Sequence, residues 1–367
     1  MKIKNKCLFI AVFVISVLIS AKETPKKNNL YQFAGRIEHL EDGGTLLIGS
    51  ASSVTFEFTD LSCEIYLKSV DKNYEHHNYV VLELDGEYLG RFTIKKGGLK
   101  TFPIQVTKLQ PMHRLTIFKA TEAANGSVLF TGTNAHLTKI KQPKKKKVEF
   151  IGDSITCGYG NDATSIPCGK GEWYDQHNAY MAYGPQLARM LDFDYVLSSV
   201  SGIGMYRNWN DEHENEAIMP DVYENLYLNK DYGKPYDFAF QPDLVSICLG
   251  TNDLSDGDGK KKRLPFNENK YVSNYIDFIK TVYLHAPKTR IILLTSPMVS
   301  GTKNDVLLRC LNRVITAFAA DKNHQPIQLF EFEPMRPNGC GYHPDMIDDT
   351  VMANQLQPFF KELLDEN

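Results

Sequence analysis

Three short polar segments carry side chains whose chemistry is complementary. The first, Gly-Asp-Ser, ends at Ser154 and directly follows the apolar run 148–151. A serine on the turn that leaves a strand exposes its hydroxyl at the edge of a sheet, where it can attack a carbonyl. The second, Gly-Thr-Asn-Asp, contains Asn252 and follows the apolar run 244–249. The amide of Asn252 can donate a hydrogen bond to a developing oxyanion.

The third segment, Tyr-His-Pro-Asp, contains His343 and precedes the last apolar pattern of the chain. A histidine in that place can take the proton of a serine hydroxyl. Each segment alone also fits an ordinary turn, because Gly, Asn, Asp and Ser are common turn residues. The serine elbow of the α/β-hydrolases has Gly two residues after the serine, where this chain has Thr156, so a different serine turn is indicated.

The second half of the chain alternates between strand and helix patterns. This alternation predicts a parallel sheet with helices on both faces, and ligands of such sheets bind at the carboxyl ends of the strands. The predicted strands lie at 148–151, 195–197, 244–249, 291–294 and 327–330. The predicted helices lie at 180–191, 271–282, 306–319 and 351–363.

The first half shows only strand patterns. Apolar residues alternate with polar ones over 54–58 and 63–67, and Asp85-Gly86 and Asn125-Gly126 mark hairpin turns. We therefore expect a β-sandwich of about 110 residues. Gln142-Pro143 and four lysines follow as a linker. The predicted organisation is a signal peptide at 1–21, a β-sandwich domain at 30–141 and a catalytic domain at 147–367.

The N-terminal segment has the pattern of a secretory signal. Three lysines precede the apolar stretch Cys7 to Ile19, and Ser20 and Ala21 supply small residues for cleavage. We expect a secreted or periplasmic protein with no membrane segment after cleavage; a retained anchor is the alternative reading. The 367 residues include 41 basic and 44 acidic side chains, a net charge of −3, so no nucleic-acid partner is indicated.

The cysteine spacing shows neither a zinc site nor a dense disulfide scaffold. Cys248 and Cys310 lie in apolar runs and are predicted to be buried thiols. Cys157 and Cys168 flank a short loop and could form a disulfide in an oxidising compartment, a question the sequence leaves open.

The order and spacing of the three segments resemble those of the SGNH (GDSL-type) hydrolases. The residues around the segments are similar to those of carbohydrate esterase family 2, a family that includes acetyl xylan esterases. In this resemblance the glycine of the second block is Gly202. Four further stretches look like that family: Phe150 to Gly160, Leu249 to Ser255, Thr121-Glu122-Ala123 and Phe130-Thr131-Gly132. The resemblance implies a three-layer α/β/α domain with a parallel sheet, preceded by a β-sandwich of the jelly-roll type.

The resemblance implies a serine esterase that removes O-acetyl groups from plant polysaccharide or oligosaccharide, such as acetylated xylan or glucomannan. Ser154 would be the nucleophile and His343 the base. The N–H groups of Ser154 and Gly202 and the side chain of Asn252 would form the oxyanion hole. No metal or cofactor is expected, and the oligomeric state is left undetermined.

The sequence departs from the superfamily at the acid that normally orients the histidine. Cys340 stands three residues before His343 and Gly341 two residues before it, where relatives carry an acid. Some members of carbohydrate esterase family 2 use a Ser–His dyad, and the resemblance implies such a dyad here, with the Tyr342 carbonyl as the group that orients the imidazole. An acid from elsewhere in the chain is the alternative. Asp345 is interpreted as the cap of the last helix.

Aromatic residues near the three segments are candidates for stacking on sugar rings, although ordinary loop packing explains them equally well. We expect Trp173, Trp209 and Tyr342 to contact substrate. Two other functions stay open. One is an SGNH lipase or thioesterase acting on small or lipid esters, and the other is a carbohydrate-binding protein without catalysis.

Overall fold

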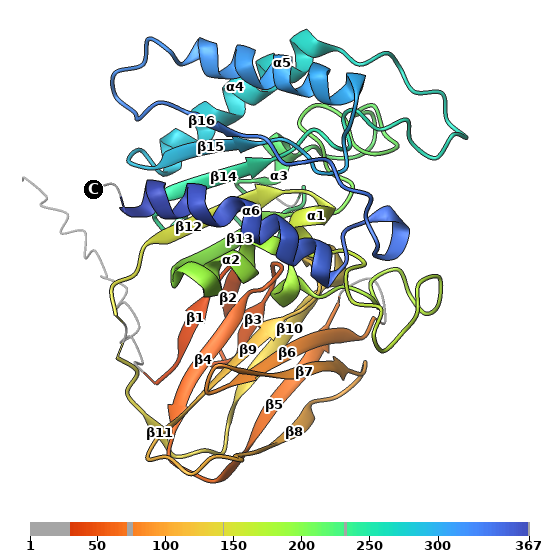
Figure 1. Cartoon of the computed structure of the whole chain (residues 1–367). Coiled ribbons are helices and arrows are strands. Elements are labelled where there is room, and N and C mark those ends of the chain that lie inside the picture. The colour runs from red at the N-terminus through yellow and green to blue at the C-terminus, as the bar shows by residue number, and fades with distance from the viewer. Residues whose placement is uncertain (1–29, 72–75, 142, 231–232, 366–367) are drawn as a thin grey trace, which may run out of the picture.

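The computed structural model describes residues 30–71, 76–141, 143–230 and 233–365. The predicted signal peptide at 1–21 lies outside these residues. The described chain folds into a β-sandwich and, above it in Figure 1, an α/β domain built on a parallel sheet. The predicted fold class is therefore confirmed, whereas the boundaries 30–141 and 147–367 stay a prediction.

The β-sandwich consists of two antiparallel sheets. One has the order β1 (Gln32–Ala34), β4 (Ser53–Phe58), β9 (His113–Lys119), β6 (Asn78–Leu84) and β7 (Glu87–Ile94), with β11 (Leu137–Thr138) paired to β4. The other has the order β2 (Ile37–His39), β3 (Thr45–Leu47), β10 (Ser127–Thr133), β5 (Ser62–Val70) and β8 (Lys100–Gln105). Their inner faces enclose one apolar core, including Phe56, Phe58, Ile65 and Leu67.

The hairpin between β6 and β7 forms where the sequence indicates it. Asp85 and Gly86 both have positive φ, 53° and 82°. A two-residue hairpin turn of this kind matches the twist of the strands it joins, and glycine adopts the conformation without a steric penalty.

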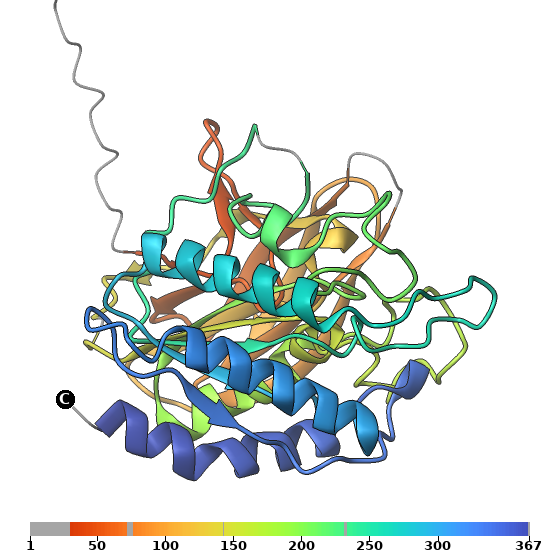
Figure 2. The ribbon, with the colours of Figure 1, turned by 90° about the horizontal axis from the view of Figure 1, so that it is seen from above.

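The α/β domain is a five-stranded parallel sheet between two helical layers. The strand order is β13 (Asp194–Ser199), β12 (Lys147–Gly152), β14 (Leu244–Cys248), β15 (Arg290–Leu294) and β16 (Gln328–Phe330). Helices α2 (Tyr183–Leu191) and α6 (Met346–Asp365) pack on one face of the sheet. Helices α4 (Glu268–His285) and α5 (Thr302–Ala317) pack on the other, as Figure 2 shows from above. Two single-turn helices, α1 (Ser154–Cys157) and α3 (Met219–Val222), follow β12 and β13.

All four predicted helices start at other residues in the structure; α4 begins at Glu268 rather than at 271, and α5 at Thr302 rather than at 306. The pattern at 180–191 divides into a 3₁₀ turn, Ala179–Met181, and α2. The last helix begins at Met346, five residues before the predicted start, because Asp345 caps it. The Asp345 carboxylate accepts the N–H groups of Ile347 and Asp348, each at 2.8 Å, which confirms the interpretation of Asp345 as a helix cap.

The sandwich and the α/β domain share a packed interface. Tyr180 of the 3₁₀ turn lies between Phe118 and Tyr88 of the sandwich, with ring centroids 5.0 and 5.4 Å away. Its hydroxyl donates to the Glu83 carboxylate at 2.7 Å. The sandwich therefore directly contacts the 3₁₀ turn that precedes α2.

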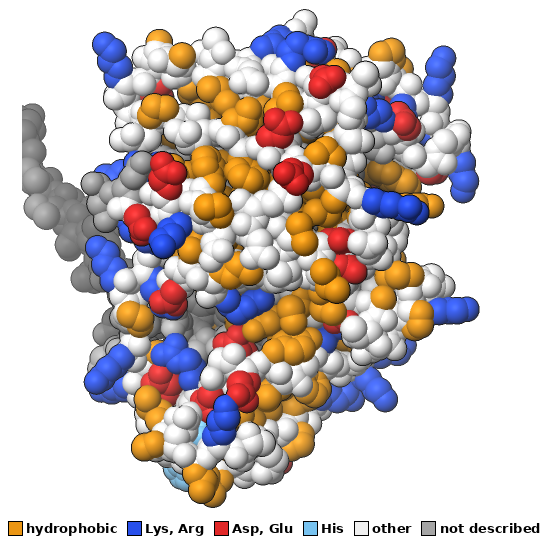
Figure 3. All heavy atoms as spheres, viewed as in Figure 1, with side chains coloured by type: hydrophobic (Ala, Val, Ile, Leu, Met, Phe, Trp, Pro, Cys, Tyr) orange, Lys and Arg blue, Asp and Glu red, His pale blue; other side chains and the backbone are white. Residues whose placement is uncertain are grey.

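The surface carries charges of both signs. On the face in Figure 3, basic and acidic side chains are interspersed, as the nearly neutral composition predicts. No helix within the described residues is long and apolar enough to cross a membrane.

Candidate active site

The carboxyl edge of the parallel sheet brings the three polar segments together. β12 ends at Gly152, and Ser154 begins α1 immediately after it. Asp153 caps this turn, because its carboxylate accepts the Ile155 N–H at 3.0 Å. The neighbouring strand β14 leads into Asn252, and His343 lies on the loop before α6. Parallel strands end at one edge, so residues 189 positions apart become neighbours.

Ser154 and His343 form a direct hydrogen bond. The Ser154 Oγ lies 2.7 Å from His343 Nε2, and His343 Nδ1 lies 2.9 Å from the Gly341 carbonyl oxygen. A carbonyl oxygen only accepts, so Nδ1 carries the proton and Nε2 is free to accept from the Ser154 hydroxyl. This tautomer is the one a general base needs.

The carbonyl that orients His343 belongs to Gly341, so the prediction of the Tyr342 carbonyl is wrong by one residue. Gly341 and Tyr342 both have left-handed φ, 63° and 62°, which turns the Gly341 carbonyl toward the ring. A Cβ at Gly341 would lie 3.3 Å from Tyr159, so glycine also suits the close packing there. Among the described residues no carboxylate hydrogen-bonds to His343.

Burial controls the basicity of His343. It lowers the pKa of His343 to about 4, with a further contribution from the charge of His177, while the Gly341 carbonyl acts in the opposite direction. The neutral imidazole that accepts a proton is therefore the dominant form well below the ordinary pKa of 6.5.

This lowered pKa predicts an acid-tolerant pH profile. As pH rises through the pKa, His343 loses its proton and becomes a base, so kcat/KM on p-nitrophenyl acetate should climb and then level off. We expect the half-maximal value between about pH 4 and 5. Rates measured from pH 3.5 to 8, with a check that the fold persists at each pH, test this; a half-maximal value at pH 6.5 or above contradicts it.

Three potential oxyanion donors lie on the loops at the carboxyl edge of the sheet. The Asn252 amide donates to the Ile203 carbonyl at 2.8 Å and to the Asp153 carboxylate at 3.3 Å, so it can donate to an oxyanion only by giving up one of these bonds, the longer one to Asp153 being the weaker. Gly202 follows β13 with φ of 78°, and its carbonyl accepts the Trp209 N–H at 2.9 Å. Its own N–H and that of Ser154 at the start of α1 bond to no other described residue. These donors can stabilise an oxyanion.

Asp253 is a site residue that the sequence reasoning did not identify. Its carboxylate accepts the N–H groups of Met205, Tyr206 and Arg207 at 2.8–3.2 Å. Burial raises the pKa of Asp253 to about 6, with those N–H groups opposing the rise. Asp253 thereby holds the loop that follows Gly202. Its position at the end of the Gly-Thr-Asn-Asp segment is the sequence feature that could have identified it.

One disulfide joins the site to an insertion. Cys168 is bonded to Cys340, so a Cys157–Cys168 pair is ruled out. Cys157 is a buried free thiol whose Sγ lies 3.2 Å from the Ser199 hydroxyl, inside the nucleophile turn. Cys248 and Cys310 are buried free thiols, as predicted. The disulfide ties the loop that holds His343 to the loop that holds Trp173.

Breaking this disulfide should destabilise the protein. The Cys168→Ser/Cys340→Ser variant is expected to melt at least about 5 °C below the wild type, since loss of a native disulfide costs about 2–5 kcal/mol. Adding a reductant should lower the Tm of the wild type toward that of the variant and leave the variant unchanged. Equal melting temperatures for wild type and variant without reductant would contradict the stabilising role.

The three candidate aromatic residues are exposed and lie near His343 or Gly202. Trp173 is 44% exposed and stacks at 6.3 Å on Tyr159, which in turn packs 4.4 Å from His343. Trp209 is 46% exposed beside Gly202, and Tyr342 is 86% exposed next to His343. Tyr159, which the sequence reasoning did not identify, contacts both Trp173 and His343. Contact of these rings with a sugar stays a prediction.

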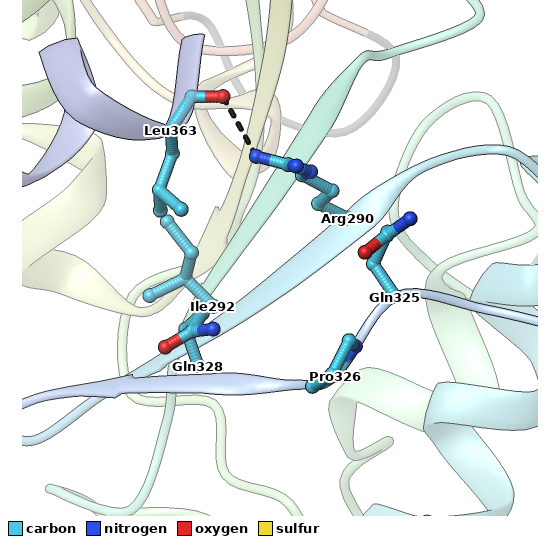
Figure 4. A pocket seen from close by; sticks show the side chains of 6 residues that line it. All are labelled: Arg290, Ile292, Gln325, Pro326, Gln328 and Leu363. Carbon is cyan, nitrogen blue, oxygen red and sulfur yellow. Dashed lines mark hydrogen bonds between the residues drawn. The ribbon is translucent and has the colours of Figure 1, made fainter. Parts of the chain in front are cut away.

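A small cavity lies at the other end of the sheet. It has a volume of about 60 Å³ and is lined by residues of β15, β16 and the end of α6, where Arg290 donates to the Leu363 carbonyl (Figure 4). Arg290 begins β15 and Gln328 begins β16, so the cavity is at the amino edge, away from Ser154. It contributes nothing to the site. No cluster of three or more potential metal ligands occurs within the described part of the chain.

Two family models match this chain. Residues 150–351 match the GDSL-like lipase/acylhydrolase family, and residues 33–143 match the carbohydrate esterase 2 N-terminal domain. A curated relative from Cellvibrio japonicus, an acetylxylan esterase / glucomannan deacetylase, is 29% identical over 338 residues, covering 86% of this chain and 89% of that protein.

Solved structures share the architecture. A family two carbohydrate esterase from Clostridium thermocellum, in complex with cellohexaose, is similar with a TM-score of 0.79 and 27% identity, over 90% of this chain and 98% of that one. A family two carbohydrate esterase from Cellvibrio japonicus has the same fold, with a TM-score of 0.79 and 22% identity over 92% of this chain and 96% of that one.

Proposed function

The chain belongs to the GDSL-like lipase/acylhydrolase family and carries a carbohydrate esterase 2 N-terminal domain, and on this premise we propose that it is a serine esterase acting on O-acetylated plant polysaccharide or oligosaccharide. The observation that carries the proposal is the 2.7 Å hydrogen bond between Ser154 and His343. Acetylated xylan and glucomannan are the substrates we favour, since the curated relative is named for both activities.

In the proposed mechanism Ser154 attacks the acetyl carbonyl while His343 Nε2 takes its proton. The N–H groups of Ser154 and Gly202 and the Asn252 amide stabilise the oxyanion of the tetrahedral intermediate. This intermediate collapses as His343 gives the proton to the departing sugar oxygen, and an acetyl-enzyme remains. Water, activated by His343, then releases acetate and restores Ser154.

The Gly341 carbonyl takes the orienting role that a carboxylate has in a triad. It fixes the tautomer of His343 but offers less charge to the imidazolium that forms during the reaction. We therefore propose a Ser–His dyad. The absence of a carboxylate on His343 among the described residues is also the feature that favours the second candidate function, carbohydrate binding without catalysis.

We also propose that the chain is exported and that residues 1–21 are its cleaved signal. The basic start and the apolar stretch at 7–19 support this. The Cys168–Cys340 disulfide also supports it, since disulfides persist in oxidising compartments.

Acetate release from acetylated xylan and acetylated glucomannan tests the function, beside p-nitrophenyl esters of two, four and eight carbons. We expect release from at least one polymer and a preference for the acetyl ester. Good activity only on the longer esters would replace this proposal with an SGNH lipase or thioesterase. Activity on no ester, together with binding of the polymers, would replace it with a binding protein.

A further inference from the structure

A buried carboxylate of the β-sandwich reaches the loop that carries the oxyanion donor. Glu122 follows β9 and is fully buried. Its Oε2 accepts the Ser201 N–H at 2.8 Å, across the interface between the two parts of the chain. The same oxygen lies 3.6 Å from the Sγ of Cys157, which is in the nucleophile turn α1. No step of the proposed mechanism uses Glu122. Because burying a carboxylate costs free energy unless the carboxylate is paired, its presence at this interface needs another explanation.

This contact anchors the peptide just before the oxyanion donor. The Gly202 N–H belongs to the peptide between Ser201 and Gly202. Glu122 holds the N–H of the preceding peptide, and the Trp209 N–H holds the carbonyl of the following one at 2.9 Å. The donor peptide is therefore fixed on both sides, and one of the two anchors comes from the sandwich.

The turn that presents Glu122 is itself held in place by a buried lysine. Lys119 is fully buried at the end of β9, and its Nζ donates to the carbonyls of Thr121 and Glu122 at 2.9 and 2.7 Å. Burial lowers the pKa of Lys119 to about 7, while the charge of Glu122 raises it. These contacts curl the segment after β9 so that the Glu122 side chain points away from the sandwich.

The other carboxylate oxygen of Glu122 begins a series of side-chain contacts that leads to His343. Its Oε1 lies 3.4 Å from Nε2 of the fully buried His177. The His177 ring packs 4.5 Å from Tyr159, and Tyr159 packs 4.4 Å from His343. Burial raises the pKa of Glu122, but the contacts with His177 and the Ser201 N–H lower it by more. The pKa of Glu122 is therefore below its usual value. The carboxylate is thus a charged acceptor at neutral pH.

We propose that Glu122 is a positioning residue for the esterase reaction, which fixes the Ser201–Gly202 peptide so that its N–H points at the oxyanion. This assigns the sandwich a part in catalysis. The inference rests on the proposed function, and it predicts a defect in transition-state stabilisation rather than in substrate binding.

The test compares Glu122→Ala, Glu122→Gln and a matched control, Glu83→Ala. Glu83 also lies on the sandwich and accepts a hydrogen bond from the α/β domain, but from Tyr180, away from the oxyanion loop. We expect Glu122→Ala to lower kcat on p-nitrophenyl acetate by about 10- to 100-fold with KM within about twofold, less than the loss of an entire oxyanion donor. Glu122→Gln should recover most of this activity, because its amide oxygen still accepts the Ser201 N–H.

A second readout separates this inference from the proposed function. The rate at which diethyl p-nitrophenyl phosphate labels Ser154 depends on the oxyanion donors but needs no acetyl ester, and it should fall in Glu122→Ala as kcat does. If the wild type cleaved no acetyl ester, the proposed function would fail while this labelling still tested Glu122. If Glu122→Ala does not fold, Glu122→Asp replaces it in the test. The shorter side chain keeps the charge but moves the acceptor oxygen away from Ser201, so kcat and the labelling rate should fall in the same way.

Three results would overturn the inference. One is a folded Glu122→Ala, or the Asp variant in its place, with wild-type kcat and labelling rate. Another is an equal loss of kcat in Glu83→Ala, which would indicate a general loosening of the interface. The third is a Glu122→Gln as impaired as Glu122→Ala, which would contradict the role of the acceptor oxygen.

Discussion

Replacing Ser154 by alanine is expected to reduce kcat for acetate release by at least about 10⁴-fold, with the melting temperature nearly unchanged. The hydroxyl is the only part of the site that forms the covalent bond in the proposed mechanism. Its removal leaves the oxyanion donors and the binding surface in place, so only a residual rate over water remains. Acetate measured from acetylated xylan by wild type and variant checks the prediction.

The matched control is Ser62→Ala, an exposed serine at the start of β5 in the sandwich. It should keep the full wild-type rate. A Ser154→Ala variant that is folded and retains more than about a tenth of wild-type kcat would mean that another group attacks the ester.

Replacing His343 by glutamine should cost nearly as much, about 10³- to 10⁵-fold in kcat. Glutamine can still hydrogen-bond to the Ser154 hydroxyl, but it cannot take the proton. The dyad arrangement makes the loss large, because among the described residues no carboxylate hydrogen-bonds to the Ser154 hydroxyl, so none can take its proton in place of His343. Steady-state rates on p-nitrophenyl acetate, with circular dichroism to verify the fold, measure the loss.

The Asp345→Asn variant tests whether Asp345 acts as an acid that orients His343. Asp345 lies two residues after the histidine, but its carboxylate caps α6, and His343 Nδ1 faces the Gly341 carbonyl. We therefore expect a loss of less than about threefold in kcat, with a small fall in Tm. A loss as large as that of His343→Gln would show that Asp345 acts as the missing acid.

The sequence predicted the elements that carry the chemistry because strand and helix periods are local signals. The apolar runs at 148–151 and 244–249 became β12 and β14, and the topology rule for parallel sheets placed Ser154 and Asn252 at one edge. The role of His343 was predicted from the family resemblance of the three segments together, since its position before the last helix alone is weak evidence. The structure brings His343 to Ser154, while the catalytic roles of both stay proposals.

What the sequence did not predict depends on geometry between distant segments. Cys168 and Cys340 are 172 residues apart, and only the approach of their two loops decides the pairing. The choice of the Gly341 carbonyl depends on the left-handed φ of Tyr342, which is uncommon for a residue other than glycine. The contact of Glu122 with Ser201 crosses the domain interface, where no periodicity applies.

Within the part of the chain that the structure describes, His343 has no carboxylate partner, and a glycine carbonyl and a disulfide constrain its loop instead. Cys340 holds the loop through Cys168, and Gly341 supplies the carbonyl that fixes the ring. Positions 340 and 341, where the resemblance leads us to expect an acid, therefore constrain the loop here rather than supply charge.

The most direct test of the central claim is to trap the covalent intermediate. The enzyme is mixed with excess p-nitrophenyl acetate, quenched in acid within the first turnovers, digested and mapped by mass spectrometry. The account predicts an acetyl group on Ser154 in the wild type and none in Ser154→Ala. Acetyl groups found only on lysines, or ester hydrolysis that proceeds at the full rate with Ser154 never modified, would contradict it.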